Sequence, residues 1–293
     1  MFLIDSLLSP KSPDRDRAST CPSASASVSQ NPASVETGAS TASSPTAQSL
    51  VDHSSTSSQS VRSRCCTWLA TLVYPLARYV VLPFYFRRIE VSGRQNLPAT
   101  GPVILAPTHR SRWDALLVPY AAGQDITGRP LRFMVTVDEM NGIQGWFIRR
   151  LGGFPINTRQ PAIAALRHSV ELLQQREVLV IFPEGGDLDH NRFCDVNRLQ
   201  PGLARLALQA EASQPNLEIQ IVPINIIYSR PRVPWRSKAQ IRIAPPIKVS
   251  NYCLEKPKAS AKQLTADLET ALRSAQSRVT KESLSCDKQF KQH

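Results

Sequence analysis

Short apolar runs alternate with amphipathic stretches along residues 102–244, and this alternation constrains the fold more than any other feature. The runs PVILAP at 102–107 and VLVIF at 178–182 are short and almost wholly apolar, as buried strands are. Between them, residues 162–175 carry apolar side chains every three or four positions, which is the spacing of one helix face. The sequence therefore predicts an α/β domain with a largely parallel sheet covered by helices.

The same reasoning places the other elements of this domain, which we expect to span residues 89–280. Further strands are predicted at 131–135, 154–156, 218–227 and 240–244, and further helices at 113–122, 138–151, 201–212 and 261–279. Asp138 is expected to cap the helix that follows it. Residues 281–293 are predicted to be a flexible C-terminal tail.

Residues 1–64 predict a region of another kind. They contain 24 Ser or Thr, five basic and five acidic residues, and no aromatic side chain except Phe2. Such a segment buries too little apolar surface to offset its chain entropy, so we expect a disordered tail. An organellar transit peptide is the alternative, but the five acidic residues and the balanced charge favour a tail.

The formal charge of +12 falls entirely on residues 65–293, because the first 64 residues are balanced. A basic folded domain indicates an anionic partner, which could be a membrane surface, a phosphorylated substrate or a nucleic acid. Nucleic acid is not expected, since no aromatic and basic RNA motif, zinc-finger spacing or basic zipper is present. The six cysteines lack the spacing of a disulfide framework, which favours a reducing compartment.

Residues 65–88 predict a membrane-associated helical segment. The stretch CCTWLATLVYPLARYVVLPFYF at 65–86 holds one charge, Arg78, and two prolines, which suit a straight transmembrane span poorly. Its Trp and Tyr residues are spread as in segments at the membrane interface, and Arg87 and Arg88 could meet lipid phosphates. We expect a monotopic helix, or two half-helices, in one leaflet. The alternative is an apolar helix that packs on the domain.

The sequence THRSRWD at 108–114 follows the first predicted strand. His109 on the loop after the strand and Asp114 in the first turn of the next helix would let the carboxylate accept a hydrogen bond from the imidazole. That bond fixes the tautomer and leaves the other ring nitrogen as a base. A surface histidine beside a helix-capping aspartate is the alternative.

Three further motifs follow in order: GGFPINTR ending at Arg159, FPEGG from Phe182 to Gly186, and Val222-Pro223. Together with His109 and Asp114, they resemble the glycerolipid acyltransferase family, which includes the 1-acylglycerol-3-phosphate acyltransferases. The resemblance covers residues 85–245. This chain departs from the family pattern in three places. Thr108 stands where the family has Asn, and Thr158 is an extra residue before the arginine. Gly186-Asp187 follow FPEG where the family usually has Thr or Ser and then Arg.

The resemblance implies that a fatty acyl group moves from a thioester to the free hydroxyl of a lysophospholipid, 1-acyl-sn-glycerol-3-phosphate in particular, to give phosphatidic acid. His109, oriented by Asp114, would be the base, and Arg159 would bind the acceptor phosphate. Glu184 would accept hydrogen bonds from glycerol hydroxyl groups or support the site from its turn.

Three more residues receive implied roles at the substrate. Gly185 and Gly186 would let the backbone approach it, and Arg112 would help to bind phosphate or thioester. No metal or cofactor is implied beyond the co-substrate, an acyl-carrier protein or coenzyme A thioester. The expected location is the cytoplasmic face of a membrane or its organellar equivalent, with membrane lipid and an anionic surface as partners.

Two other functions stay open at this point. Ser111 lies between His109 and Asp114, so a lipid hydrolase with a Ser-His-Asp set is conceivable, although the chain has no G-x-S-x-G motif. A basic peripheral membrane protein without catalytic activity would also explain the charge and the segment at 65–86. A labelled acyl donor separates the three functions. An acyltransferase transfers the label to the acceptor, a hydrolase releases labelled free acid, and a non-catalytic protein does neither.

Overall fold

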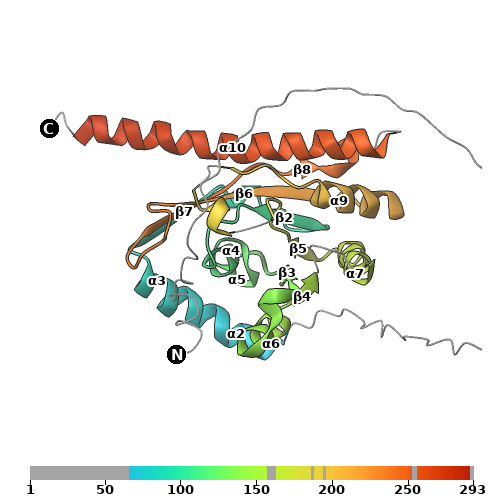
Figure 1. Cartoon of the computed structure of the whole chain (residues 1–293), viewed down its shortest axis with the longest axis horizontal. Helices are drawn as coiled ribbons and strands as arrows, with labels where there is room; N and C mark the ends of the chain where they lie inside the picture. The colour runs from blue at the N-terminus through green and yellow to red at the C-terminus, as the bar shows by residue number, and fades with distance from the viewer. Residues whose placement is uncertain (1–65, 157–162, 186–187, 194–195, 253–255, 291–293) are drawn as a thin grey trace, which may run out of the picture. The chain divides into compact units, whose positions relative to one another are not determined.

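One mixed sheet organises the domain (Figure 1). The computed structural model describes residues 66–156, 163–185, 188–193, 196–252 and 256–290, so the predicted tail at 1–64 lies outside the described residues. The strands are β1 Arg88–Ser92, β2 Val103–Pro107, β3 Leu131–Thr136, β4 Gly153–Ile156, β5 Val178–Val180, β6 Gln220–Tyr228, β7 Lys238–Ile243 and β8 Ile247–Lys248.

The sheet is largely parallel, as predicted. Its order is β1-β7-β6-β2-β5-β3-β4, with β8 also paired to β6. Five of the strand pairs in the described residues are parallel, and β6 runs antiparallel to β7 and β8. Because β2 lies between β5 and β6, the loop that follows β2 leaves from the centre of the sheet.

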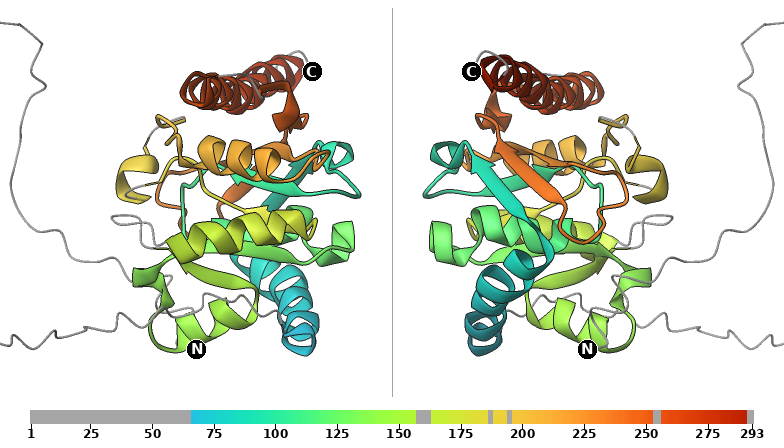
Figure 2. Two further views of the ribbon diagram at one scale, coloured as in Figure 1. Left: turned by 90° about the vertical axis from the view of Figure 1, so that its right-hand side faces the viewer. Right: turned by 90° about the vertical axis from the view of Figure 1, so that its left-hand side faces the viewer.

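Helices cover the sheet on both faces (Figures 1 and 2). They are α2 Thr67–Leu76, α3 Leu82–Tyr85, α4 Asp114–Ala122, α5 Gln124–Thr127, α6 Gly142–Arg150, α7 Ile163–Gln174, α8 Leu188–Asn191, α9 Gly202–Ser213 and α10 Pro257–Phe290. Short 3-10 turns occupy Arg94–Asn96, Val137–Met140 and Val249–Tyr252.

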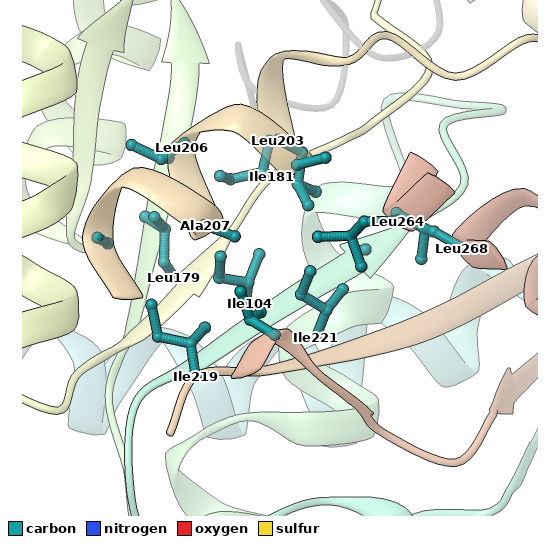
Figure 3. Close-up of a cluster of buried hydrophobic side chains, with 14 of the residues drawn as sticks. Ile104, Leu179, Ile181, Leu203, Leu206, Ala207, Ile219, Ile221, Leu264 and Leu268 are labelled. Carbon is teal, nitrogen blue, oxygen red and sulfur yellow. The ribbon is translucent and has the colours of Figure 1, made fainter. Parts of the chain in front are cut away.

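The main core lies between the sheet and α7, α9 and α10. Alternate residues of the central strands point into it, and Ile104, Leu179 and Ile221 are fully buried there (Figure 3). The intervening residues, such as Leu105 and Val180, are also buried, on the other face of the sheet. Burial on both faces explains why these strands are continuous apolar runs in the sequence.

Several boundaries differ from the sequence-based expectation. Asp138 does not cap a helix, because it lies in the 3-10 turn Val137–Met140. Asn141 is the residue that precedes α6. Gly142 adopts a left-handed φ of +61°, which separates the 3-10 turn from α6. The strand β1 was not predicted, since RIEVS alternates charged and apolar residues at the edge of the sheet. Residues 281–290 of the expected tail are helical, because α10 continues to Phe290 through a stretch without glycine or internal proline.

Within the segment predicted at 65–88, residues 67–85 form a helix whose two sides differ. A π-helical turn at Ala77–Val81 joins α2 to α3, so neither Pro75 nor Pro83 ends it. Arg78 faces the domain, where it forms an ion pair of 2.6 Å with Asp125 and stacks on Tyr120. The opposite side exposes large apolar side chains, which are Trp68, Leu72, Leu76, Tyr79, Val80 and Phe84. In the described residues, no helix is both long and apolar enough to cross a membrane.

Candidate active site

The loop after β2 carries the first predicted site residues at the middle of the sheet. Thr108 is fully buried there, and its hydroxyl accepts a 2.9 Å hydrogen bond from the Ile226 backbone N–H of the neighbouring strand β6. A threonine at this position therefore ties the loop to β6. The bond fixes where the chain turns toward His109.

His109 and Asp114 are brought together as the spacing predicted. The His109 Nδ1 atom lies 3.1 Å from Asp114 Oδ2. Since an ionised carboxylate can only accept, Nδ1 carries the proton and Nε2 is left free as a base. The ring also packs on Phe182, with centroids 4.2 Å apart, and the side chain is 24% exposed. The imidazole is thus held in orientation while part of its surface remains accessible.

Asp114 is fully buried at the start of α4, and donors meet both of its oxygens. The backbone N–H groups of Arg110 and Ser111 donate to Oδ2 over 2.6 Å and 2.8 Å, and the Tyr228 hydroxyl donates to Oδ1 over 2.5 Å. Burial, and then the Asp114 carboxylate, raise the pKa of Tyr228 well above its ordinary value. Tyr228 therefore stays a neutral donor that keeps the carboxylate in place.

Glu184 lies beneath the same loop with a fully buried side chain. Arg110 donates to both of its oxygens, over 2.7 Å and 2.9 Å, in a bidentate ion pair. The backbone N–H groups of His109 and Asn197 complete the set, each over 2.9 Å. All four acceptor positions of this carboxylate are therefore taken by the protein.

The other predicted site residues are placed differently. Arg112 is exposed and forms a 3.1 Å ion pair with Glu139. Gly185 follows Glu184 in a left-handed conformation, and its carbonyl accepts from Asn191. Arg159 and Gly186 lie outside the described residues.

Sequence reasoning missed two functional side chains, Arg110 and Tyr228. Arg110 sits inside the THRSRWD motif, where it reads as one more surface arginine. Tyr228 is 114 residues from Asp114, and only the pairing of β2 with β6 brings them together. Glu184 could have pointed to Arg110, because a carboxylate directly after a buried strand needs a cation if it is itself buried.

Ser111 does not join His109 and Asp114 in a catalytic set within the described residues. Its hydroxyl accepts from the Trp113 backbone N–H over 3.4 Å and also bonds the Tyr228 hydroxyl, which lowers the Tyr228 pKa slightly against the larger effect of burial. The side chain is buried. This geometry does not favour the hydrolase alternative.

No group of three or more His, Cys, Asp or Glu side chains in the described residues is placed to hold a metal ion. The ionisable side chains at the loop instead bond one another. What the arrangement can do is accept a proton at His109 Nε2.

An acyltransferase family model matches residues 88–227, which include β1, the whole loop after β2 and all of β6 except its last residue, Tyr228. Residues 88–227 are therefore similar to an acyltransferase domain. The fold agrees: the structure of the 1-acyl-sn-glycerophosphate acyltransferase PlsC from Thermotoga maritima superposes with a TM-score of 0.56 at 17% identity, covering 73% of this chain and 80% of that one.

Curated relatives of the acyltransferase domain carry two kinds of name. The chain is 30% identical over 86 residues to the 1-acyl-sn-glycerol-3-phosphate acyltransferase of Streptococcus pneumoniae, which is 28% of this chain and 30% of that protein. It is also 30% identical over 156 residues to glycerol-3-phosphate acyltransferase 1, mitochondrial, of Mus musculus, which is 48% of this chain and 18% of that one. The chain spans less than half the length of either relative.

Proposed function

We propose that this chain transfers a fatty acyl group from a thioester to the free hydroxyl of a lysophospholipid, with 1-acyl-sn-glycerol-3-phosphate as acceptor and phosphatidic acid as product. The observation that carries the proposal is the His109–Asp114 pair on the central loop of an acyltransferase domain. The name of the Streptococcus pneumoniae relative supports this acceptor.

The proposed reaction needs one base and no covalent enzyme intermediate. His109 Nε2 takes the proton from the acceptor hydroxyl as its oxygen attacks the thioester carbonyl carbon. The carbon–sulfur bond then breaks, and the leaving sulfur takes the proton back from the imidazolium to leave as a thiol. Asp114 holds the ring in the tautomer that makes Nε2 basic, and its carboxylate stabilises the imidazolium while it exists.

Glu184 acts in this proposal as a support for the loop. Both of its oxygens bond Arg110 and backbone N–H groups, so a substrate hydroxyl would have to displace a protein donor to reach it. We therefore favour the second of the two roles that the sequence left open. Gly185 and Gly186 keep their proposed role of letting the backbone approach the acceptor.

Arg159 is proposed to bind the acceptor phosphate, since a guanidinium offers two donors in one plane. Arg112, which is exposed near the base, is the alternative phosphate ligand. Arg159→Ala and Arg112→Ala separate them: loss of the phosphate contact raises KM for the acceptor and spares KM for the acyl donor. If neither substitution changes acceptor KM, both assignments are wrong.

The experiment that tests the function uses purified protein in detergent micelles with a labelled acyl thioester. Lysophosphatidate and glycerol 3-phosphate are compared as acceptors, because relatives carry both names. Coenzyme A and acyl-carrier-protein thioesters are compared as donors. Labelled phosphatidic acid supports the proposal, whereas labelled free fatty acid or unchanged thioester contradicts it. Association with the cytoplasmic face of a membrane is part of the same proposal, and it rests on the exposed apolar side of the segment at 65–88.

A further inference from the structure

The connection between β6 and β7, residues 229–237, is a basic exposed loop beside the N-terminal helical segment. Its sequence SRPRVPWRS contains three arginines and no acidic residue. Arg230, Arg232 and Arg236 are exposed, and Trp235 is 58% exposed between them. Within the described part of the chain, no ion pair joins these arginines to a carboxylate. We call residues 229–237 the arginine loop.

The arginine loop is anchored to the helical segment by several hydrogen bonds. The Tyr85 hydroxyl donates to the Val233 carbonyl over 2.7 Å, and the Arg236 N–H donates to the Tyr85 carbonyl over 2.7 Å. The Trp235 indole N–H donates to the Phe84 carbonyl over 3.1 Å. Val233 is 3% exposed and serves as the buried centre of the loop. The exposed arginines and the indole are therefore presented by a fixed backbone.

The arginine loop also continues the apolar side of the helical segment. The exposed residues of that side recur about once per helical turn from Trp68 to Phe84. The Phe84 and Trp235 rings lie 6.3 Å apart, so the indole extends the same surface beyond the end of α3. Figure 2 shows the β6–β7 hairpin reaching the helical segment. Along this surface, the apolar side chains of the helical segment are thus followed by the Trp235 ring and then by the arginines of the loop.

We propose that the arginine loop is a second lipid-binding element, which contacts the phosphates of anionic lipids while Trp235 lies at headgroup level. This inference rests on the proposed membrane association of the chain. Helices that lie in an interface bury an apolar face and carry cations at its border, and Trp favours the headgroup region. Guanidinium groups bind phosphate through paired donors.

An acidic protein, such as an acyl-carrier protein, would also be attracted by three arginines. The exposed indole and Phe84 favour a membrane, because they prolong an apolar surface that starts at Trp68. The position on the strand favours it too. β6 places Tyr228 against Asp114 directly before the loop, and β6 runs parallel to β2, so a leaflet bound there would lie near the strand ends that carry His109.

The test uses the full chain and two kinds of vesicle, phosphatidylcholine alone and phosphatidylcholine with phosphatidylglycerol. The variant R230Q/R232Q/R236Q is compared with R167Q/R205Q/K262Q, which removes the same charge from exposed positions on α7, α9 and α10. Each loop arginine should contribute about fivefold at low salt, so the loop variant should lose about a hundredfold in affinity for the anionic vesicles. On phosphatidylcholine it should bind almost as the wild type does, and added salt should shrink the difference.

Trp235→Ala should weaken binding to both kinds of vesicle several-fold, because apolar insertion does not depend on lipid charge. Equal losses for the loop and control variants would overturn the proposal, since net charge alone would then explain binding. A loop variant that binds anionic vesicles normally but has a raised KM for an acyl-carrier-protein thioester would also overturn it, in favour of a protein partner. Wild-type transfer in detergent micelles is measured separately, so failure of the proposed function is distinguishable from failure of this one.

Discussion

At the loop after β2, two buried carboxylates meet a donor on each oxygen, whereas along α2 and α3 large apolar side chains face solvent. Asp114 and Glu184 are held by backbone N–H groups, Tyr228 and Arg110. On the helical segment, the one central charge, Arg78, is turned toward the domain and paired with Asp125. The first region satisfies its groups within the chain and so fixes a geometry. The second leaves apolar surface uncovered, which a leaflet would bury.

The largest expected effect lies in the first region. His109→Ala removes the proposed base, so kcat should fall by about 10²- to 10⁴-fold and the loss should persist at saturating acceptor. Steady-state kinetics on purified protein measure it. Ser111→Ala is the comparison variant and should keep most of its activity, because the serine hydroxyl contacts Trp113 and Tyr228. A severe loss in Ser111→Ala together with release of free fatty acid would favour hydrolysis.

The second expected effect separates buried from exposed charge pairs. Glu184→Gln removes the charge of the carboxylate from the buried ion pair with Arg110, which should destabilise the fold by about 3–5 kcal/mol. Glu139→Gln breaks the exposed pair with Arg112 and should change stability by no more than about 1 kcal/mol. Urea unfolding of both variants gives the two values. Similar losses of stability in the two variants would mean that the burial of Glu184 does not govern its contribution to folding stability.

The third effect compares the two sides of the helical segment. Leu82 is fully buried against the domain, so Leu82→Ala should cost about 2–5 kcal/mol of folding stability. Leu72 is 62% exposed, so Leu72→Ala should leave stability almost unchanged and weaken vesicle binding by about tenfold. Thermal unfolding and vesicle sedimentation measure the two outcomes. If Leu72→Ala unfolds early and still binds vesicles fully, the exposed side packs on protein instead.

A smaller effect should follow from a change at Tyr228, the hydrogen-bond donor to Asp114 that the sequence did not reveal. Tyr228→Phe removes one hydrogen bond to Asp114, so kcat should fall about tenfold while KM for the acceptor stays the same. Because the pKa of Tyr228 is raised well above 10, the phenol stays protonated at every pH below that value. The variant should therefore keep the shape of the wild-type pH–rate profile at a lower amplitude. A new ionisation below pH 10 in either profile would contradict this role.

The smallest effect concerns stability in acid. Burial lowers the pKa of His168, which packs edge-on against Phe154 with Glu171 and Arg132 nearby. The unfolded chain therefore binds a proton first as the pH falls below about 6.5, so stability should decline there. His168→Gln should flatten this decline in thermal unfolding midpoints measured between neutral and acidic pH. The exposed His190→Gln is the control and should behave as the wild type.

Most of the fold could be predicted because its central strands are buried on both faces. Continuous apolar runs such as residues 103–107 identify such strands without any tertiary information. The edge strand β1 could not be found this way, because Arg88 and Glu90 interrupt its pattern. The far end of α10 was missed because its polar residues lack a clear apolar periodicity.

The candidate site was predictable where its residues are close in sequence. A five-residue spacing was enough to bring His109 and Asp114 together. The sequence could not decide between the two roles of Glu184, because that choice depends on Arg110 pointing inward from a different loop. Tyr228 was out of reach for the same reason, since only strand pairing places it beside Asp114.

The strand β6 serves two regions at one end, since Tyr228 orients Asp114 and the arginine loop begins at the next residue. For protein engineering, a change in the composition of this loop should therefore have a different consequence from a change in its length. Replacing exposed arginines by lysine, glutamine or glutamate should retune lipid preference while the β6–β7 register persists. Inserting or deleting residues would shift the hydrogen bonds between Tyr85 and the loop, and that strain would pass along β6 to Tyr228. Libraries that diversify residues 230, 232 and 236 at constant length should consequently yield many more active enzymes than libraries that vary the length of the same segment.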